Sequence, residues 1–210
     1  MNPSEPPRVP LDAAALRRAL VDDGPYSALD VTARTASTND DLAAAGAAHL
    51  TVLAAEEQTA GRGRLGRVWA APPASSLLVS VAVRPPAAAA GRLTWLPLVA
   101  GLATQRAART ALAGPPGGTA PGREHDAGPS DGAAVPLGLA WPNDVVADLA
   151  ARGAAPVPGF GRTRKLAGIL CQTVPLPGGG VPAVVIGIGL NVSQTTAELP
   201  VPSATSLAQL

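Results

Sequence analysis

Residues 184–192 (VVIGIGLNV) place the strongest constraint on the fold, because two kinds of side chain alternate along them. In an extended strand, the large apolar side chains at positions 186, 188, 190 and 192 share one face, and Gly187, Gly189 and Asn191 share the other. The apolar face predicts a strand packed in a sheet. The glycine face leaves a trough beside the backbone, which either a ligand or a closely packed helix can occupy.

The rest of the chain supplies partners for this strand. Residues 76–84 alternate in the same way, and residues 92–113 form the longest helical pattern, with Trp95, Val99 and Leu102 on one side. Further strands are expected at 28–34, 51–57, 137–148 and 164–174, and helices at 11–20 and 37–46. Strands in runs with helices between some of them predict an α+β (mixed α/β) fold, with a central mixed β-sheet flanked by helices.

Composition narrows the function classes. Aromatic residues make up only 2% of the 210 residues, so alanine, valine and leucine must form most of the core. The net charge of +1 argues against a general nucleic-acid or membrane binder. Cys171 is the single cysteine and there are two histidines, which excludes a disulfide framework and makes a His-rich metal centre or a Ser-His-Asp hydrolase unexpected. With no signal peptide and no apolar run of membrane-spanning length, we expect a cytoplasmic protein.

Residues 61–67 (GRGRLGR) are the most informative segment for chemistry. Three glycines alternate with guanidinium groups, so the backbone can turn tightly while several cations face one ligand. This arrangement is typical of a loop that wraps a phosphate or carboxylate, although a solvated or RNA-binding arginine–glycine loop is the alternative. The segment is neither a Walker loop nor a dinucleotide fingerprint.

Lys165 is the only lysine among 16 basic residues. The other basic residues of this chain are all arginine. A lysine at the start of a strand therefore indicates a specific role for its ammonium group beside an anion. A solvent-facing strand end is the alternative. Residues 37–39 (STN) are equally compatible with a helix cap and with a ligand site. Asn143 and Asp144, which follow Pro142, are more typical of turn residues.

Taken together, the segments resemble the biotin–protein ligase family. The resemblance covers about residues 28–207 and consists of motifs in the same order: 37–40 (STND), Gln58 with 61–67, Trp69, 141–144 (WPND), 165–170 (KLAGIL) and 187–192 (GIGLNV). It implies the class II synthetase-like biotin/lipoate ligase catalytic domain at residues 26–210, after an N-terminal extension with a short helix at 1–25.

The resemblance implies a reaction in two steps. The carboxylate of biotin attacks the α-phosphorus of ATP, with Mg²⁺ bound through the phosphates, and gives biotinyl-5′-adenylate and pyrophosphate. A lysine of a biotin carboxyl carrier domain then attacks the mixed anhydride and releases AMP. Because the first step joins two anions, the site must supply fixed positive charge and orientation.

The resemblance also assigns site residues. It implies catalytic roles for Lys165, Arg62 and Arg64. It implies that biotin is bound by Ser37, Thr38, Asn39, Gln58, Arg62, Gly63, Arg64, Lys165, Gly168, Gly187 and Gly189. It implies that ATP or the adenylate contacts Arg62, Arg64, Arg67, Trp69, Asn143, Lys165 and Asn191. Asp144 is expected to position the incoming lysine or a metal, and no protein ligand to a metal is assigned.

Three departures from the family pattern are expected. The residues before the first strand are too few for the winged helix of members that double as repressors, so we expect no DNA binding. The small C-terminal β-barrel of the family is expected to be absent. Residues 114–134, rich in glycine and proline, are expected to form a disordered insertion.

Two other functions remain open at this stage. One is a lipoate or octanoate transfer enzyme of the same fold, although Cys171, inside a strand run, reads better as a buried apolar residue than as a thioester nucleophile. The other is a truncated, non-catalytic module that binds biotin or RNA. RNA binding predicts stacking aromatic residues, which this chain largely lacks.

Overall fold

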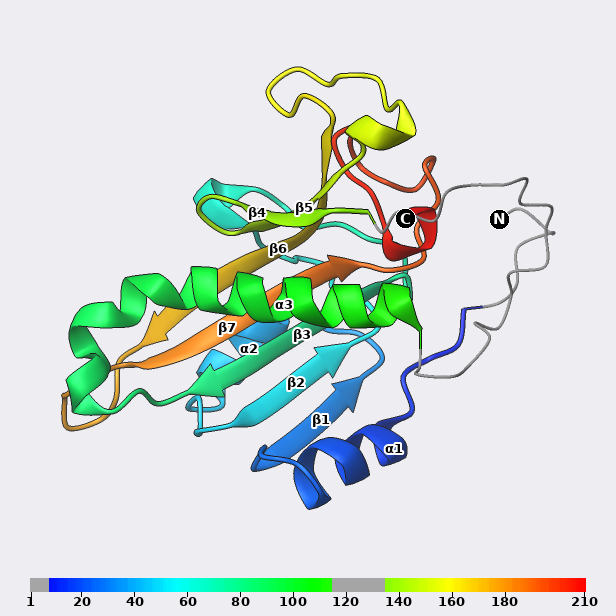
Figure 1. Cartoon of the computed structure of the whole chain (residues 1–210). Coiled ribbons are helices and arrows are strands. Elements are labelled where there is room, and N and C mark those ends of the chain that lie inside the picture. The colour runs from blue at the N-terminus through cyan, green and yellow to red at the C-terminus, as the bar shows by residue number, and fades with distance from the viewer. Residues whose placement is uncertain (1–7, 115–134) are drawn as a thin grey trace.

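A seven-stranded mixed sheet organises the computed structural model, which describes residues 8–114 and 135–210 (Figure 1). The strands are β1 (Ala28–Thr32), β2 (Thr51–Ala55), β3 (Ser76–Val83), β4 (Leu137–Ala140), β5 (Asp144–Asp148), β6 (Thr163–Val174) and β7 (Ala183–Asn191). Their order across the sheet is β1-β2-β3-β7-β6-β5-β4. Only β1 and β2 run parallel, and every other neighbouring pair is antiparallel. The mixed sheet confirms the predicted α+β class.

Helices cover both faces of the sheet. α3 (Leu96–Ala113) lies across the face in front in Figure 1 and packs on β4 to β7, and α2 (Thr38–Ala44) packs behind on β2, β3 and β7. α1 (Ala13–Arg17) lies beside β1 and continues into a π-helical turn. Within the described ranges, no helix combines the length and the apolarity needed to cross a membrane.

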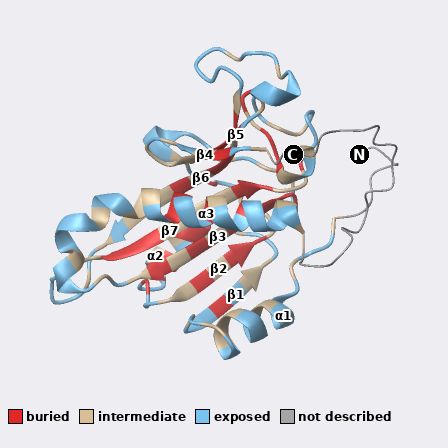
Figure 2. Cartoon of the chain, viewed as in Figure 1, coloured by how far each residue is buried: buried red, intermediate tan, exposed pale blue. Residues whose placement is uncertain are grey.

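The core has one cluster on each side of the sheet, and the buried positions follow the central strands (Figure 2). The cluster under α3 contains Leu166, Ile169 and Leu190, and the smaller cluster under α2 contains Leu42 and Val185. Aliphatic side chains fill both clusters, as the low aromatic content predicts. On β3, residues 77, 79, 81 and 83 share a face as expected, but they are half-buried. The opposite face, residues 76, 78, 80 and 82, is the buried one.

The large apolar residues that share one side of the long helix do not face the sheet. Trp95, Val99 and Leu102 are 64%, 59% and 41% exposed, and the buried positions of α3 are Ala100, Gly101, Thr104 and Ala108. The helix lies so close to the sheet that a Cβ on Gly101 would come within 3.2 Å of Leu139 Cδ2. Small residues therefore make this contact, and the large side chains point away from the sheet.

Two other expectations change in detail. The single strand expected over 137–148 is the hairpin of β4 and β5, because the turn at residues 141–143 contains Pro142, which has no N–H for a ladder. The first helix is shorter than 11–20, and Asp12 caps it by accepting from the N–H of Ala15 at 2.9 Å. The insertion expected at 114–134 lies outside the described residues, apart from Gly114.

Candidate functional site

One cavity of about 790 Å³ lies on the α2 side of the sheet. Its lining includes every residue that the sequence assigned to the site: Ser37, Thr38, Asn39, Gln58, Arg62, Gly63, Arg64, Arg67, Trp69, Asn143, Asp144, Lys165, Gly168, Gly187, Gly189 and Asn191. These residues come from segments more than 150 positions apart, so the fold brings together what the chain separates. Four cationic side chains, Arg62, Arg64, Arg67 and Lys165, and one carboxylate, Asp144, line the cavity.

The N-terminus of α2 forms one end of the cavity. Ser37 caps the helix by accepting from the N–H of Asp40 at 3.4 Å, so the capping interpretation holds for this residue. The backbone N–H and the hydroxyl of Thr38 both donate to Oε1 of Gln58, at 2.8 and 3.0 Å. Gln58 uses its carbonyl oxygen for these bonds, so its NH₂ group is the end that can donate to a ligand.

Ser80 of β3 belongs to the same polar group, and the sequence interpretation missed it. Its side chain is fully buried, and its Oγ lies 2.7 Å from Thr38 Oγ1 and 2.6 Å from Asn39 Oδ1. The only signal in the sequence was a serine on the buried face of an apolar strand. Such a residue needs a hydrogen-bond partner, but the pattern does not say which one.

Asn39 explains one glycine of the trough. A Cβ on Gly187 would lie 2.2 Å from Asn39 Oδ1, so only glycine lets α2 approach β7 this closely. The Asn39 amide donates to Leu170 O at 3.2 Å and accepts from Ser80. Both ends of the amide are therefore used within the chain, and Asn39 shapes the floor of the cavity.

The indole of Trp69 fills the rest of the trough. Gly168 and Gly189 are cross-strand neighbours on β6 and β7, and a Cβ on them would lie 3.1 Å from Trp69 Cζ3 and 2.5 Å from Trp69 Cε2. Close packing therefore accounts for the glycine face, because Asn39 of α2 and the Trp69 indole lie against it, and both residues also line the cavity. Trp69 Nε1 is buried and has no hydrogen-bond partner among the described residues, so it is a donor left for a ligand.

A β-bulge aims Lys165 into the cavity. Val145 and Val146 are consecutive on β5, but they pair with Ala167 and Lys165, so Leu166 is an extra residue on β6. Strict alternation from Ala167 would place Lys165 on the α3 face. Instead Leu166 is buried in the cluster under α3, and Lys165 Nζ lies 3.2 Å from the Cβ position of Gly168 on the cavity side.

Lys165 is held by a carboxylate and an aromatic ring. Its Nζ lies 2.8 Å from Asp144 Oδ1 and 5.7 Å from the centre of the Trp69 ring. The Lys165 and Asp144 side chains are 27% and 20% exposed, so water screens this pair only in part. The solvent-facing strand end, the alternative interpretation of Lys165, is therefore wrong.

The arginine–glycine loop closes the cavity from the side of β2. Residues 61–69 form a tight loop, in which the N–H of Gly63 donates to Arg67 O at 2.7 Å. Arg62 Nη2 lies 3.0 Å from Asp40 Oδ2 at the start of α2. Arg64 and Arg67 are exposed at the mouth, where their guanidinium groups can meet an anion.

Asn143 and Asn191 line the cavity, but their side chains also bond to the backbone. Asn143 Nδ2 donates to Ile169 O at 2.8 Å. Asn191 is buried, with Nδ2 donating to Thr205 O at 2.9 Å and Oδ1 accepting from Gln194 Nε2 at 3.0 Å. These bonds fix the shape of the site.

Residues 193–206, here called the wall segment, complete the cavity beyond the end of β7. Pro200, Val201, Ser203 and Ala204 line it. The N–H of Lys165 donates to Ser203 O at 2.7 Å, and the N–H of Thr205 donates to Lys165 O at 2.9 Å. The wall segment therefore takes the place of β7 beside Lys165. The sequence interpretation did not assign any residue of this segment to the site.

Cys171 does not belong to the site. It is absent from the cavity lining, and burial raises the pKa of its thiol to about 11. At neutral pH almost none of it is thiolate, the form that acts as a nucleophile. Among residues 8–114 and 135–210, no group of three or more histidine, cysteine, aspartate or glutamate side chains could hold a metal ion.

The fold and the cavity define an α+β domain in which an arginine–glycine loop and a strand lysine converge on one ligand site. The family model described as "Biotin/lipoate A/B protein ligase family" matches residues 29–191. The chain belongs to this family.

Relatives with assigned names agree. The chain is 39% identical over 208 residues to the biotin–[acetyl-CoA-carboxylase] ligase of Mycobacterium tuberculosis, covering 97% of this chain and 64% of that protein. It is 30% identical over 185 residues to the bifunctional ligase/repressor BirA of Bacillus subtilis, covering 86% and 45%. The biotin protein ligase of Aquifex aeolicus, solved with biotin and ATP, superposes with a TM-score of 0.59 at 26% identity, covering 88% and 61%. The chain thus spans less than two thirds of the length of each.

Proposed function

We propose that the chain activates biotin with ATP as biotinyl-5′-adenylate and transfers it to a lysine of a biotin carboxyl carrier domain. One observation carries the proposal: Lys165, the arginine–glycine loop and the Thr38–Gln58 pair converge on one cavity. The named relatives support it, since the Mycobacterium tuberculosis protein is a biotin–[acetyl-CoA-carboxylase] ligase and the Aquifex aeolicus structure contains biotin and ATP.

The charges of the cavity fit the adenylation step. Carboxylate and triphosphate repel each other, and four cationic side chains in the lining offset that repulsion, two of which, Arg62 and Lys165, are also paired with Asp40 and Asp144. Lys165 contributes a compact ammonium, and the bulge at Leu166 fixes its direction before substrate arrives. We assign to Lys165 the contact with both the carboxylate and the α-phosphate oxygens, and to Arg62 and Arg64 the closure over the adenylate.

The polar group at α2 fits the uncharged end of biotin. The ureido ring offers both donors and acceptors, and it needs partners of fixed direction. Thr38 donates to Gln58 through its N–H and its hydroxyl, and Ser80 Oγ contacts Thr38 Oγ1, so the Gln58 NH₂ group has a defined position. Trp69 lies between this end and Lys165, with a buried indole N–H free to donate.

Magnesium and the acceptor lysine complete the proposed reaction. The cavity offers a single carboxylate, Asp144, which is bonded to Lys165. This donor set fits a Mg²⁺ ion that arrives on the phosphates of ATP and not one caged by the protein. We assign Asp144 to orient Lys165 beside the incoming carrier lysine. The need for ATP supports a cytoplasmic location.

Direct assay tests the proposal. The full chain, incubated with biotin, ATP and Mg²⁺, should release pyrophosphate and form biotinyl-5′-adenylate, and a carrier domain should then become biotinylated. Omission of biotin is the control. No biotin-dependent pyrophosphate release would refute the proposed adenylation, and adenylate without transfer would refute only the second step.

Lipoate or octanoate transfer is the second candidate, because the family description covers both biotin and lipoate. The raised pKa of Cys171 argues against a thioester on this residue. Competition of lipoate with biotin in the same assay separates the two substrates.

A further inference from the structure

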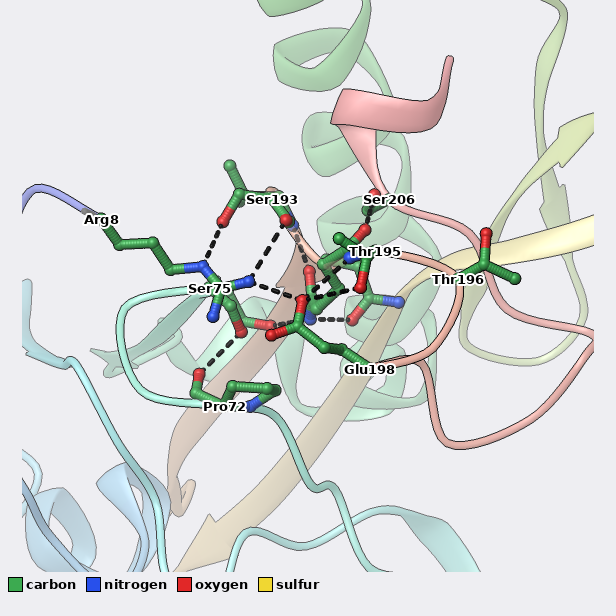
Figure 3. A network of polar contacts seen from close by, with 12 residues as sticks. Arg8, Pro72, Ser75, Ser193, Thr195, Thr196, Glu198 and Ser206 are labelled. Atoms are coloured by element: carbon green, nitrogen blue, oxygen red, sulfur yellow. Dashed lines mark hydrogen bonds and ion pairs between the residues drawn. The ribbon is translucent and has the colours of Figure 1, made fainter. Parts of the chain in front are cut away.

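The N-terminal segment is tied to two parts of the cavity wall. Arg8 lies 185 and 190 positions from its partners Ser193 and Glu198, and these contacts form the network in Figure 3. The N–H of Leu11, three residues on, donates to Glu56 Oε1 at 2.6 Å. Glu56 directly follows β2, two positions before Gln58. The segment thus bridges the β2 side of the site and the wall segment.

Arg8 fastens both ends of one turn of the wall segment. Its Nε donates to Ser193 Oγ at 3.1 Å, and its Nη2 lies 2.6 Å from Glu198 Oε2. The same Glu198 oxygen accepts from the N–H of Thr195 at 2.9 Å. The Arg8 and Glu198 side chains are 21% and 26% exposed, so this is a partly buried ion pair with extra hydrogen bonds and not a loose surface contact.

The rest of the wall segment leads directly to Lys165. Pro200 and Val201 follow the Glu198 turn and line the cavity. The N–H of Lys165 then donates to Ser203 O at 2.7 Å, and the carbonyl of Lys165 accepts from the N–H of Thr205 at 2.9 Å. A shift of the turn is therefore transmitted along a few residues to the backbone that carries the only ammonium of the site.

We propose that Arg8 is a positioning residue for the adenylation: through Glu198 it holds the wall segment, and the wall segment holds Lys165. This inference rests on the proposed function. Arg8 is not among the residues that line the cavity, so we assign its effect on the reaction to the geometry of Lys165. Misplacement of a catalytic group by about 1 Å can reduce a rate by up to about 10²-fold.

Kinetics of biotin-dependent pyrophosphate release provide the first test. Arg8→Ala and Glu198→Ala should each lower kcat about 10-fold and leave the Kd for biotin within about two-fold, because the Thr38–Gln58 end is untouched. The losses in the double variant should be clearly less than additive, since both substitutions remove the Arg8–Glu198 pair, although Arg8 also bonds Ser193 and Glu198 also accepts from Thr195. Arg8→Lys should recover part of the rate. Arg17→Ala, whose pair with Asp30 at 3.7 Å is exposed, is the matched control and should stay near wild type.

Hydrogen exchange provides a test that needs no activity. In Arg8→Ala the amide of Lys165 should exchange faster, while the amides of β2 keep their protection. Unchanged kcat, additive losses in the double variant, or wild-type exchange at Lys165 would each overturn the proposal. If the wild-type chain makes no adenylate, the proposed function fails, and exchange at Lys165 still decides whether Arg8 holds this strand.

Discussion

Asp144 Oδ1 lies 2.8 Å from Nζ of Lys165, and the two residues belong to neighbouring strands, β5 and β6. The bulge at Leu166 makes this contact, because it turns Lys165 to the cavity face. The compact ammonium of Lys165 fits between the Asp144 carboxylate and the Trp69 ring. The guanidinium of an arginine is larger and planar, so it would not fit in the same place.

Lys165→Arg should therefore lower the rate of adenylation by about 10²-fold, the scale for losing one positioned electrostatic stabiliser. Biotin affinity should fall much less, since the ureido end of the site is unchanged. Pyrophosphate release and titration calorimetry measure the two effects. Arg162→Lys, at an exposed position, is the control for interchanging arginine and lysine. Near-normal turnover in Lys165→Arg would contradict the role assigned to Lys165 in the adenylation.

Gly189→Ala should displace the indole of Trp69. The new Cβ would lie 2.5 Å from Trp69 Cε2, and the overpacking should cost about 1–3 kcal/mol in unfolding free energy. Activity should fall and tryptophan emission should change. In Gly138→Ala the nearest atom is Val146 Cγ2 at 3.9 Å, an ordinary contact, so this control should remain close to wild type. Equal behaviour of the two variants would contradict the packing described for Trp69.

Ser80→Ala should weaken both the fold and biotin binding. The substitution leaves the buried Asn39 Oδ1 without its donor, at a cost of about 1–3 kcal/mol. Urea denaturation and calorimetry with biotin measure the two effects. Ser27→Ala removes one exposed hydrogen bond, to His49 O, and should change neither by more than about 0.5 kcal/mol. A Ser80→Ala variant with unchanged biotin affinity would exclude Ser80 from the positioning of Thr38 and Asn39.

Glu198 should make stability depend on pH. The hydrogen bonds from Arg8 and from the N–H of Thr195 lower the pKa of this carboxyl below its usual value. The folded chain thus binds the proton less readily than the unfolded chain, so the stabilisation is complete above the unfolded-state pKa of about 4.3 and is lost as pH falls through the folded-state pKa. The stability difference between wild type and Glu198→Gln should therefore shrink as the pH drops below about 5. A difference independent of pH would contradict the assigned cause.

Cys171 should be inert near neutral pH. Burial raises its pKa to about 11, so alkylation by iodoacetamide near neutral pH should be far slower than for free cysteine. Cys171→Ala should keep adenylation activity. Loss of transfer in this variant, with the fold intact, would support a thioester route in place of the proposed one.

Alternation in the sequence predicts the strands well, because it depends on spacing along one strand. The site residues follow from the family resemblance of the motifs, and the fold brings them to one cavity. Alternation found β3 and β7, and the glycine positions of β7 marked where Asn39 and Trp69 pack. Alternation alone places Lys165 on the wrong face, because a bulge depends on pairing with β5, which the sequence of β6 does not contain.

Contacts between distant segments could not be predicted in the same way. The large apolar residues of the long helix share one side, but α3 lies close to the sheet at Gly101 and Leu139, so the small residues are the buried ones. Ser80 and Asn39 are 41 positions apart, and Arg8 and Glu198 are 190 apart. None of these pairs has a spacing that local structure dictates, so only the folded chain shows them.

The end of β7 at Asn191 has a consequence for where this domain can be cut. The match to the family model also stops at residue 191, which makes that position look like a natural boundary, although similarity to the Mycobacterium tuberculosis ligase covers 97% of this chain. A chain shortened to 191 would keep all seven strands, yet Lys165 would lose the hydrogen bond that its N–H donates to Ser203 O and the one that its carbonyl accepts from the N–H of Thr205. The smallest unit that can hold the Lys165 ammonium in place is therefore longer than the unit that the family model outlines.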